Sequence, residues 1–171
     1  FSHTHLSGTG CSDYGDILLM PVEGYVKAAL THDDYSSGFS HDSESAKPGY
    51  YSVHLDRWNV DVELTAGRRT GMHRYTFKGK AKPEVMMDFN HRDSVIGARI
   101  SVTKTKTSTI VKGLRRSYGW SGDQPVFYYI VYSAPAINVW QQDSTRLLLQ
   151  FPKQPDGRII AKIGISSVSE E

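Results

Sequence analysis

The sequence predicts an all-β protein built as an antiparallel β-sandwich, and three observations support this. Apolar and polar residues alternate in residues 51–55 and 60–64, and a period of two is typical of half-buried strands. Turn-forming residues separate such segments at short intervals, which is typical of antiparallel sandwiches and barrels. No long window of the sequence repeats its apolar side chains at the helical period of 3.6.

Turn signals bound the predicted strands in order along the chain. The segment Asp56-Arg57-Trp58-Asn59 joins the strands at 51–55 and 60–64 as a hairpin. The other turns with clear Gly or Pro signals are Lys47-Pro48-Gly49, Lys78-Gly79-Lys80, Ser121-Gly122-Asp123 and Pro155-Asp156-Gly157. The remaining predicted strands are residues 16–21, 73–77, 85–89, 95–102, 107–112, 126–132, 137–140, 146–151 and 158–165.

Two segments depart from this strand pattern. Residues 32–50 are rich in Asp, Ser and Gly, and we expect a long polar loop that crosses the surface. Residues 169–171 place a serine ahead of two glutamates, which is typical of the first turn of a helix. The sequence leaves no room for such a helix to continue.

Length and composition exclude several classes of protein. The 171 residues correspond to about one domain, and 39% are hydrophobic, which is enough for a core. Lys plus Arg number 20 and Asp plus Glu 18, and a net charge of +2 argues against a nucleic-acid binder. No apolar run approaches the roughly 18 residues of a membrane span. Cys11 is the single cysteine, so neither an internal disulfide nor a zinc site with several cysteines can form.

The first ten residues, FSHTHLSGTG, are dense in polar groups at a position where chains usually fray. We therefore expect the chain to be a piece of a longer protein that lacks sequence at both ends. His3 and His5 lie on one face of an extended segment and favour either a metal site or a polar cleft, of which we favour the cleft. Ser7-Gly8-Thr9-Gly10 lacks the Gly-Lys ending of a phosphate-binding loop and indicates a tight turn.

Other candidate groups have plainer interpretations. Asp13 and Asp16 are close enough for an acid/base pair, but acids so near in sequence are usually caps or turn residues. The basic stretch at 104–116 is more typical of an exposed strand face than of a nucleic-acid patch. Among the tryptophans Trp58, Trp120 and Trp140, which could all stack on sugars, Trp120 lies in a turn where its ring would be exposed.

Several blocks of the sequence resemble glycoside hydrolase family 92, the calcium-dependent exo-acting α-mannosidases of bacteria. The opening FSHTHLSGTG followed by CSDYGDILLMP carries the strongest likeness. A second block contains Phe39-Ser40-His41, Glu44 and Pro48-Gly49-Tyr50-Tyr51, and it continues through residues 63–77. Residues 119–124, 133–135 and 162–169 are similar to later blocks, with Ser133-Ala134-Pro135-Ala136 departing mildly from the family pattern.

The resemblance implies that residues 1–171 are a partial amino-terminal β-sandwich domain, supersandwich-like, of a larger enzyme. In that family the sandwich packs on an (α/α)6 barrel, which carries the catalytic carboxyls and the calcium ligands. It also implies that His3, His5, Ser7 and Gly8 line the mannose pocket, with His41 and Glu44 as weaker candidates for the same junction. Catalytic and metal-binding residues are then expected outside this chain.

We thus expect the non-catalytic part of an inverting exo-α-mannosidase, inactive when isolated, that lends loops to the mannose pocket. The expected partners are mannose-containing glycans and the enzyme's own barrel domain, but no nucleic acid. The expected location is the bacterial periplasm or cell surface, in degradation of N-glycans. The alternatives are a free carbohydrate-binding β-sandwich module and a purely structural domain. Linkage specificity and oligomeric state cannot be deduced from the sequence.

Overall fold

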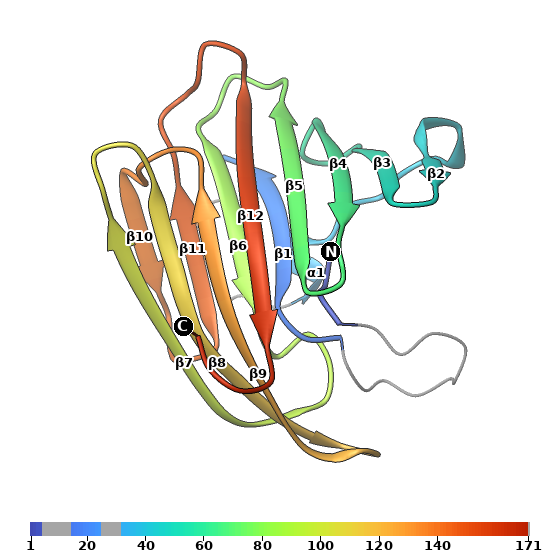
Figure 1. Ribbon diagram of the computed structural model, residues 1–171. Helices are drawn as coiled ribbons and strands as arrows, with labels where there is room; N and C mark the ends of the chain where they lie inside the picture. The colour runs from blue at the N-terminus through green and yellow to red at the C-terminus, as the bar shows by residue number, and fades with distance from the viewer. Residues whose placement is uncertain (5–14, 25–31, 171) are drawn as a thin grey trace.

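The computed structural model describes residues 1–4, 15–24 and 32–170, and nearly all of its regular structure is β-strand (Figure 1). The short helical elements are α1 (His32–Tyr35) and the 3-10 turn η1 (His41–Ser43). The strands are β1 (Leu18–Glu23), β2 (Ser45–Lys47), β3 (Tyr50–Leu55), β4 (Val60–Ala66), β5 (Thr70–Phe77), β6 (Pro83–Asp88), β7 (Ser94–Lys104), β8 (Thr109–Gly119), β9 (Gly122–Tyr132), β10 (Asn138–Gln141), β11 (Arg146–Gln150) and β12 (Arg158–Ser166).

The strands form two layers, which confirms the predicted antiparallel sandwich. The larger sheet has the order β2-β3-β4-β5-β12-β9-β8-β7, and the smaller has the order β1-β6-β11-β10. All pairings among them are antiparallel. Figure 1 shows the small sheet behind the large one, with β2, β3 and β4 extending to one side. No helix in the described ranges is long and apolar enough to cross a membrane.

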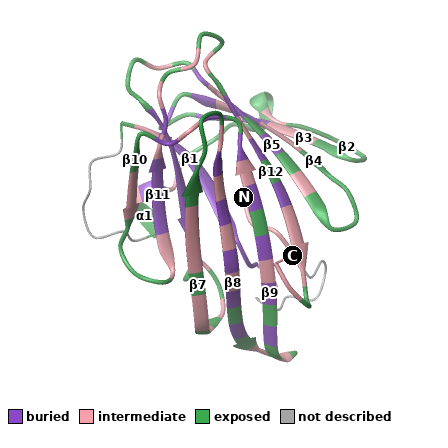
Figure 2. Ribbon diagram, turned by 60° about the vertical axis from the view of Figure 1, so that its left-hand side comes forward, coloured by how far each residue is buried: buried purple, intermediate pink, exposed green. Residues whose placement is uncertain are grey.

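Strands β1, β6 and β11 of the small sheet are buried on both faces, whereas β10 is partly exposed. Strands β1 and β6 are buried along almost their whole length, as are the three central leucines of β11 (Figure 2). Their sequences LLMPV, VMM and LLL are therefore continuous apolar runs rather than alternating ones. The large sheet alternates instead, and β9 turns Val126, Tyr128, Ile130 and Tyr132 inward.

The long strands β8 and β9 extend further than the sequence predicts. Their 11 residues each pair in register from Thr109 and Tyr132 to Gly119 and Gly122, so the turn is Trp120-Ser121. The prediction stopped at residue 112 because Gly113 and Arg115 interrupt the apolar alternation. Both face inward nevertheless, and Arg115 is fully buried.

Two further predictions were wrong in part. The segment 32–50 was expected to be a loop, yet it contains α1, η1 and β2. Tyr35 explains the helical turn, because its buried ring places its hydroxyl 2.9 Å from Asp88 Oδ2 and its carbonyl accepts a hydrogen bond from Trp58. At the other end, residues 167–170 form no helix, and Glu170 instead binds Arg99 and Lys112 on the large sheet.

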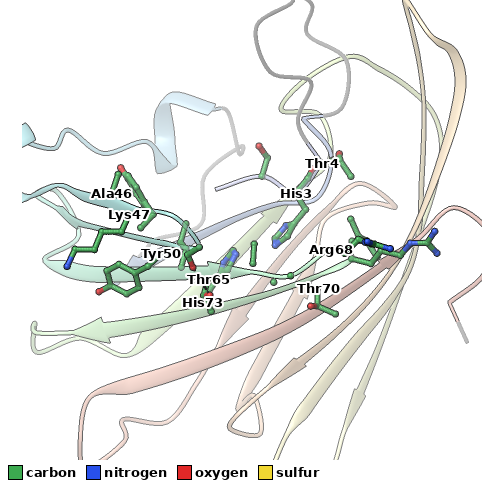
Figure 3. Close-up of a pocket in the computed structure, with 18 residues that line it drawn as sticks. His3, Thr4, Ala46, Lys47, Tyr50, Thr65, Arg68, Thr70 and His73 are labelled. Carbon is green, nitrogen blue, oxygen red and sulfur yellow. Dashed lines mark hydrogen bonds between the residues drawn. The ribbon is translucent and has the colours of Figure 1, made fainter.

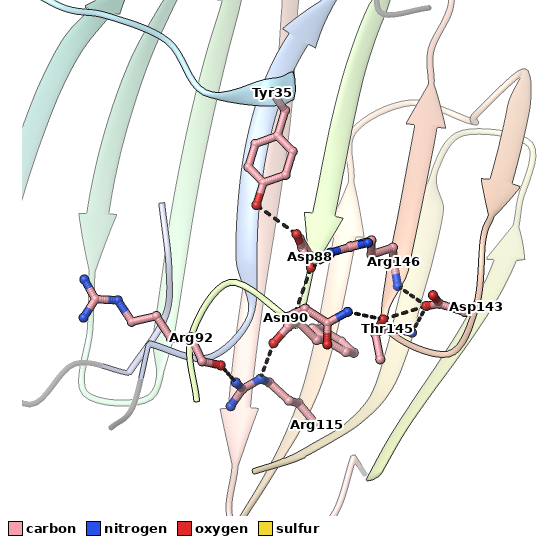
Figure 4. A network of polar contacts seen from close by, with 9 residues as sticks. Tyr35, Asp88, Asn90, Arg92, Arg115, Asp143, Thr145 and Arg146 are labelled. Carbon is pink, nitrogen blue, oxygen red and sulfur yellow. Dashed lines mark hydrogen bonds and ion pairs between the residues drawn. The ribbon is translucent and has the colours of Figure 1, made fainter. Parts of the chain in front are cut away.

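A polar network surrounds the buried carboxylate of Asp88 (Figure 4). Asp88, at the end of β6, accepts hydrogen bonds from the Tyr35 hydroxyl, from the Asn90 backbone at 2.8 Å and from Arg146 at 3.2 Å. The Asn90 amide in turn donates to Thr145 Oγ1 at 2.7 Å. The network satisfies a carboxylate that would otherwise be costly to bury.

Arg115 forms the second part of this buried polar layer. Its guanidinium donates to the Phe89 carbonyl at 3.0 Å and to the Arg92 carbonyl, and it makes an ion pair with Asp16. Both side chains of the pair are fully buried. Asp16 precedes β1, so this pair ties the N-terminal part of the chain to β8, which is next to the edge strand β7 of the large sheet.

We expect Arg115→Met to lower the free energy of unfolding of the 171-residue chain by about 3–5 kcal/mol, because it leaves the Asp16 carboxylate buried without a counter-charge. The neighbouring Arg116→Met is the matched control, since Arg116 makes an exposed pair with Asp123 and its loss should change stability little. Urea denaturation of both variants measures the difference. Equal effects of the two substitutions would contradict the role given to Arg115.

Candidate functional site

An open hollow of about 530 Å³ lies beside the small sheet, on the part of the large sheet formed by β3, β4 and β5 (Figure 3). Its walls come from four places in the sequence: residues 2–4, strands β2 and β3, the β4–β5 turn with the start of β5, and Ile165 in β12. The hollow thus brings the first residues of the chain against strands 50–70 residues further along.

Residues 1–4 reach this position by pairing with the edge of the small sheet. The Leu19 amide donates to the Phe1 carbonyl at 2.8 Å, and the imidazole of His3 bonds to the Ile17 carbonyl at 2.9 Å. The segment therefore runs antiparallel to residues 16–19 and covers the free edge of β1. This places His3 at the boundary between the two sheets.

The contacts of His3 determine its tautomer. Nδ1 is the atom that faces the Ile17 carbonyl, which can only accept, so Nδ1 carries the proton. Burial lowers the pKa of His3, so the ring is neutral and Nε2 offers a lone pair. Nε2 is buried and has no hydrogen-bond partner among the described residues. It lies against Gly71, where a Cβ would come within 3.4 Å of it.

His73, on the inner face of β5, packs against one face of the His3 ring. The two imidazoles stack with centroids 4.9 Å apart and an interplanar angle of 10°. His73 Nδ1 is 2.7 Å from the hydroxyl of Tyr75, which is fully buried. Burial, together with the charge that His3 would carry, lowers the pKa of His73 to about 2. Both rings are therefore neutral at ordinary pH.

The hollow carries positive charge at its rim. Lys47, Arg68 and Arg69 line it, and none of its described lining residues is Asp or Glu. Calcium prefers carboxylate and carbonyl oxygens, so these walls do not fit a calcium ion. The described residues contain no group of three or more His, Cys, Asp or Glu side chains that could hold a metal.

The structure places the other sequence-based candidates as follows. His5, Ser7, Gly8 and Asp13 lie outside the described residues. Asp16 is half of the buried pair with Arg115, so it has a structural role in this chain. Of the four predicted pocket residues, His3 is the one that lies within the described part of the chain.

His41 and Glu44 lie close to each other but not in the wall of the hollow. His41 Nδ1 is 2.6 Å from Glu44 Oε2, and the other Glu44 oxygen accepts a hydrogen bond from the Tyr51 hydroxyl at 2.6 Å. Tyr51 does line the hollow, and burial and Glu44 raise its pKa to about 12. The second sequence block thus reaches the hollow through Gly49, Tyr50 and Tyr51 and through its continuation in β4 and β5, and sequence reasoning selected none of these as site residues.

Of the tryptophans, Trp120 alone presents its ring to solvent. It is 80% exposed at the tip of the β8–β9 hairpin. Trp58 is buried, with its indole N–H bonded to the Tyr35 carbonyl, and Trp140 packs against the core. The basic stretch at 104–116 is no continuous surface patch, because Arg115 is buried and Lys112 pairs with Glu170.

The histidine stack predicts a loss of stability in acid. The pKa of His73 in the folded chain lies below its unfolded value of about 6.5. Below pH 6.5 the unfolded chain therefore binds a proton that the folded chain does not, and the free energy of unfolding falls until the pH reaches about 2. Between these limits we expect a slope of about 1.4 kcal/mol per pH unit from this group. Urea denaturation at pH 7, 6 and 5 measures the free energy of unfolding, which should fall less steeply with decreasing pH in His73→Phe than in the wild-type chain. Parallel pH profiles would contradict the buried neutral state.

Comparison with known proteins identifies related chains. Residues 1–166 match the model of the glycosyl hydrolase family 92 N-terminal domain. The chain is similar to the solved structure of the GH92 glycosyl hydrolase ccman5, with a TM-score of 0.84 and 24% identity over 96% of this chain and 25% of that one. No curated protein matches the chain.

Two solved structures from Bacteroides thetaiotaomicron are also similar. The GH92 α-mannosidase BT3965 aligns with a TM-score of 0.80 and 30% identity over 99% of this chain and 26% of that one, and it has also been solved with mannoimidazole. The GH92 inverting mannosidase BT2199 aligns with a TM-score of 0.72 and 23% identity over 90% and 22%. The chain spans about a quarter of the length of each of these structures. Because the family match covers nearly all of its residues, the chain belongs to the N-terminal domain family of glycosyl hydrolase family 92.

Proposed function

We propose that this chain is the partial N-terminal domain of an exo-α-mannosidase that hydrolyses terminal α-mannosides with inversion. The observation that carries the proposal is the family match over residues 1–166. It is supported by the names of two similar structures, an α-mannosidase and an inverting mannosidase, although the chain spans only a quarter of each.

Bond cleavage is assigned to a domain outside this chain. Inverting glycosidases use two carboxyl groups about 6.5–9.5 Å apart, one as acid and one as base on a water molecule. The described wall of the hollow contains no carboxylate that could serve as either. The proposal therefore assigns the acid, the base and the calcium ligands to an (α/α)6 barrel. Calcium, when bound there, would hold sugar hydroxyls as a hard cation.

The contribution of this domain is to form part of the mannose pocket. His3, His5, Ser7 and Gly8 are the proposed lining residues, and His3 is the one whose chemistry can be derived. A neutral ring with a proton on Nδ1 can accept a hydrogen bond at Nε2, and no described residue donates one to it. A sugar hydroxyl is such a donor, and it reaches Nε2 only if the start of β5 at Gly71, which lies against this atom, moves aside.

The same proposal includes the biological setting. The ligands are mannose-containing glycans, N-glycans among them, and the partner domain is the enzyme's own barrel. The location is the periplasm or the outer surface of a bacterium. BT3965 supports the ligand class, since it was solved with mannoimidazole.

We expect His3→Asn in the full-length protein to lower kcat/KM for p-nitrophenyl α-mannoside about tenfold, the equivalent of one lost hydrogen bond. The Asn amide can still donate to the Ile17 carbonyl, but no acceptor remains at the position of Nε2. His3→Gln is the matched variant, because its amide oxygen can reach that position and should retain more activity. A wild-type kcat/KM in His3→Asn would show that His3 does not contact the sugar.

A second candidate function, a free carbohydrate-binding module, is favoured by the 80% exposure of Trp120. An exposed indole can stack on a sugar ring, and Tyr118 beside it is also exposed. Titration of mannose into the 171-residue chain, followed by Trp fluorescence and NMR, tests this function. On the leading proposal we expect neither binding at millimolar mannose nor hydrolysis of aryl mannosides. Binding that is lost in Trp120→Ala would establish the module instead.

A further inference from the structure

Thr4 has a backbone conformation that its side chain disfavours. Its φ is 60°, in the left-handed region where β-branched residues are rare. Such a conformation costs of the order of 1–3 kcal/mol and persists only where surrounding contacts impose it. Thr4 directly follows His3, so whatever holds Thr4 in this conformation also fixes the backbone that carries the His3 ring.

The contact that holds Thr4 is a hydrogen bond to a buried carboxylate. Thr4 Oγ1 donates to Asp16 Oδ2 at 2.6 Å. The same hydroxyl lies 2.5 Å from the His3 carbonyl, but it has a single proton, and a carboxylate is the stronger acceptor. Replacement of this hydroxyl by a methyl group would leave the left-handed turn without its anchor.

Asp16 is itself immobilised by the interior of the sandwich. Its other carboxylate oxygen binds Arg115, whose guanidinium is fixed by the carbonyls of Phe89 and Arg92. Both charged side chains have no exposed surface, so neither can reorient without breaking a desolvated ion pair. A continuous set of contacts therefore links the centre of β8 to His3: Arg115 to Asp16, Asp16 to Thr4, and Thr4 through the backbone to His3.

We propose that Thr4, Asp16 and Arg115 are positioning residues for the sugar-binding His3, an inference that rests on the proposed function. Together with the bond from Nδ1 to the Ile17 carbonyl and the stack on His73, they hold the ring in one orientation. Orientation matters because a displacement of about 1 Å at a substrate-positioning group can cost about a hundredfold in rate. None of the three touches the sugar in this scheme.

The test is a double-mutant cycle on kcat/KM for p-nitrophenyl α-mannoside, in the full-length protein. Thr4→Val has the shape of threonine but no hydroxyl, and we expect a loss of about tenfold, similar to that of His3→Asn. Because Thr4 acts through His3, the double variant Thr4→Val/His3→Asn should also lose about tenfold rather than a hundredfold. Thr4→Ser restores the hydroxyl and should retain nearly full activity.

Thr103→Val is the matched control, since Thr103 is exposed on the edge strand β7, away from the hollow. It should leave kcat/KM unchanged. Circular dichroism and the melting temperature of each variant separate a positioning effect from unfolding. Should Thr4→Val unfold the protein, Thr4→Ala takes its place in the cycle with His3→Asn, because alanine also lacks the hydroxyl but has no β-branch to strain the left-handed conformation. The expected losses are the same.

The outcomes separate this inference from the proposed function. A tenfold loss in His3→Asn with no loss in Thr4→Val overturns the positioning role and leaves the pocket assignment intact. Additive losses, near a hundredfold in the double variant, also overturn it, because Thr4 would then act independently of His3. No loss in His3→Asn overturns the pocket assignment, and the positioning role fails with it.

Discussion

The ion pair between Asp16 and Arg115 is the constraint on which the rest of the candidate site depends. A guanidinium and a carboxylate without exposed surface are stable only as a complete set, since each leaves an uncompensated buried charge if its partner moves. The pair joins strand β8 of the large sheet to Asp16, two residues before the start of β1. Residues 1–4 form hydrogen bonds with residues 16–19, so the ion pair at Asp16 also fixes the position of residues 1–4.

This arrangement explains how residues 1–4 come to form part of the wall of the hollow. Here the segment covers the free edge of β1, stacks His3 on His73 and holds Thr4 in a strained turn. Two local features are unfavourable: His3 Nε2 has no hydrogen-bond partner within the part of the chain that the structure describes, and Thr4 has a strained φ. Local costs of this kind concentrate at functional sites, which is consistent with the proposed sugar pocket.

Much of the fold could be predicted from the sequence because the large sheet has one buried and one exposed face. Alternation in β3 and β4, and the turns around them, gave strand positions within a few residues. Prediction failed where tertiary contacts override local pattern. The predicted strand was shorter than β8 because a charged residue such as Arg115 is not expected at a buried strand position. The segment expected to be a loop contains α1 because the ring of Tyr35 is buried and its hydroxyl bonds to Asp88.

The candidate site was less accessible to sequence reasoning. The spacing of His3 and His5 indicated a metal site or a polar cleft, and only the resemblance of the first ten residues to a known family implied that His3 lines a mannose pocket. Tyr51, Gly71 and His73 join it through the register of β3, β4 and β5, which no local pattern specifies. The role of Asp16 was equally hidden, because its partner Arg115 is 99 residues away in the sequence.

The most direct measurement is a crystal structure of the full-length protein with mannoimidazole bound. The account predicts the inhibitor between this domain and a second one, with a hydroxyl within about 3.2 Å of His3 Nε2 and with the reacting carboxyl groups contributed by the second domain. An inhibitor that contacts no residue of the 1–4 segment, or a catalytic carboxylate supplied by this chain, would contradict it.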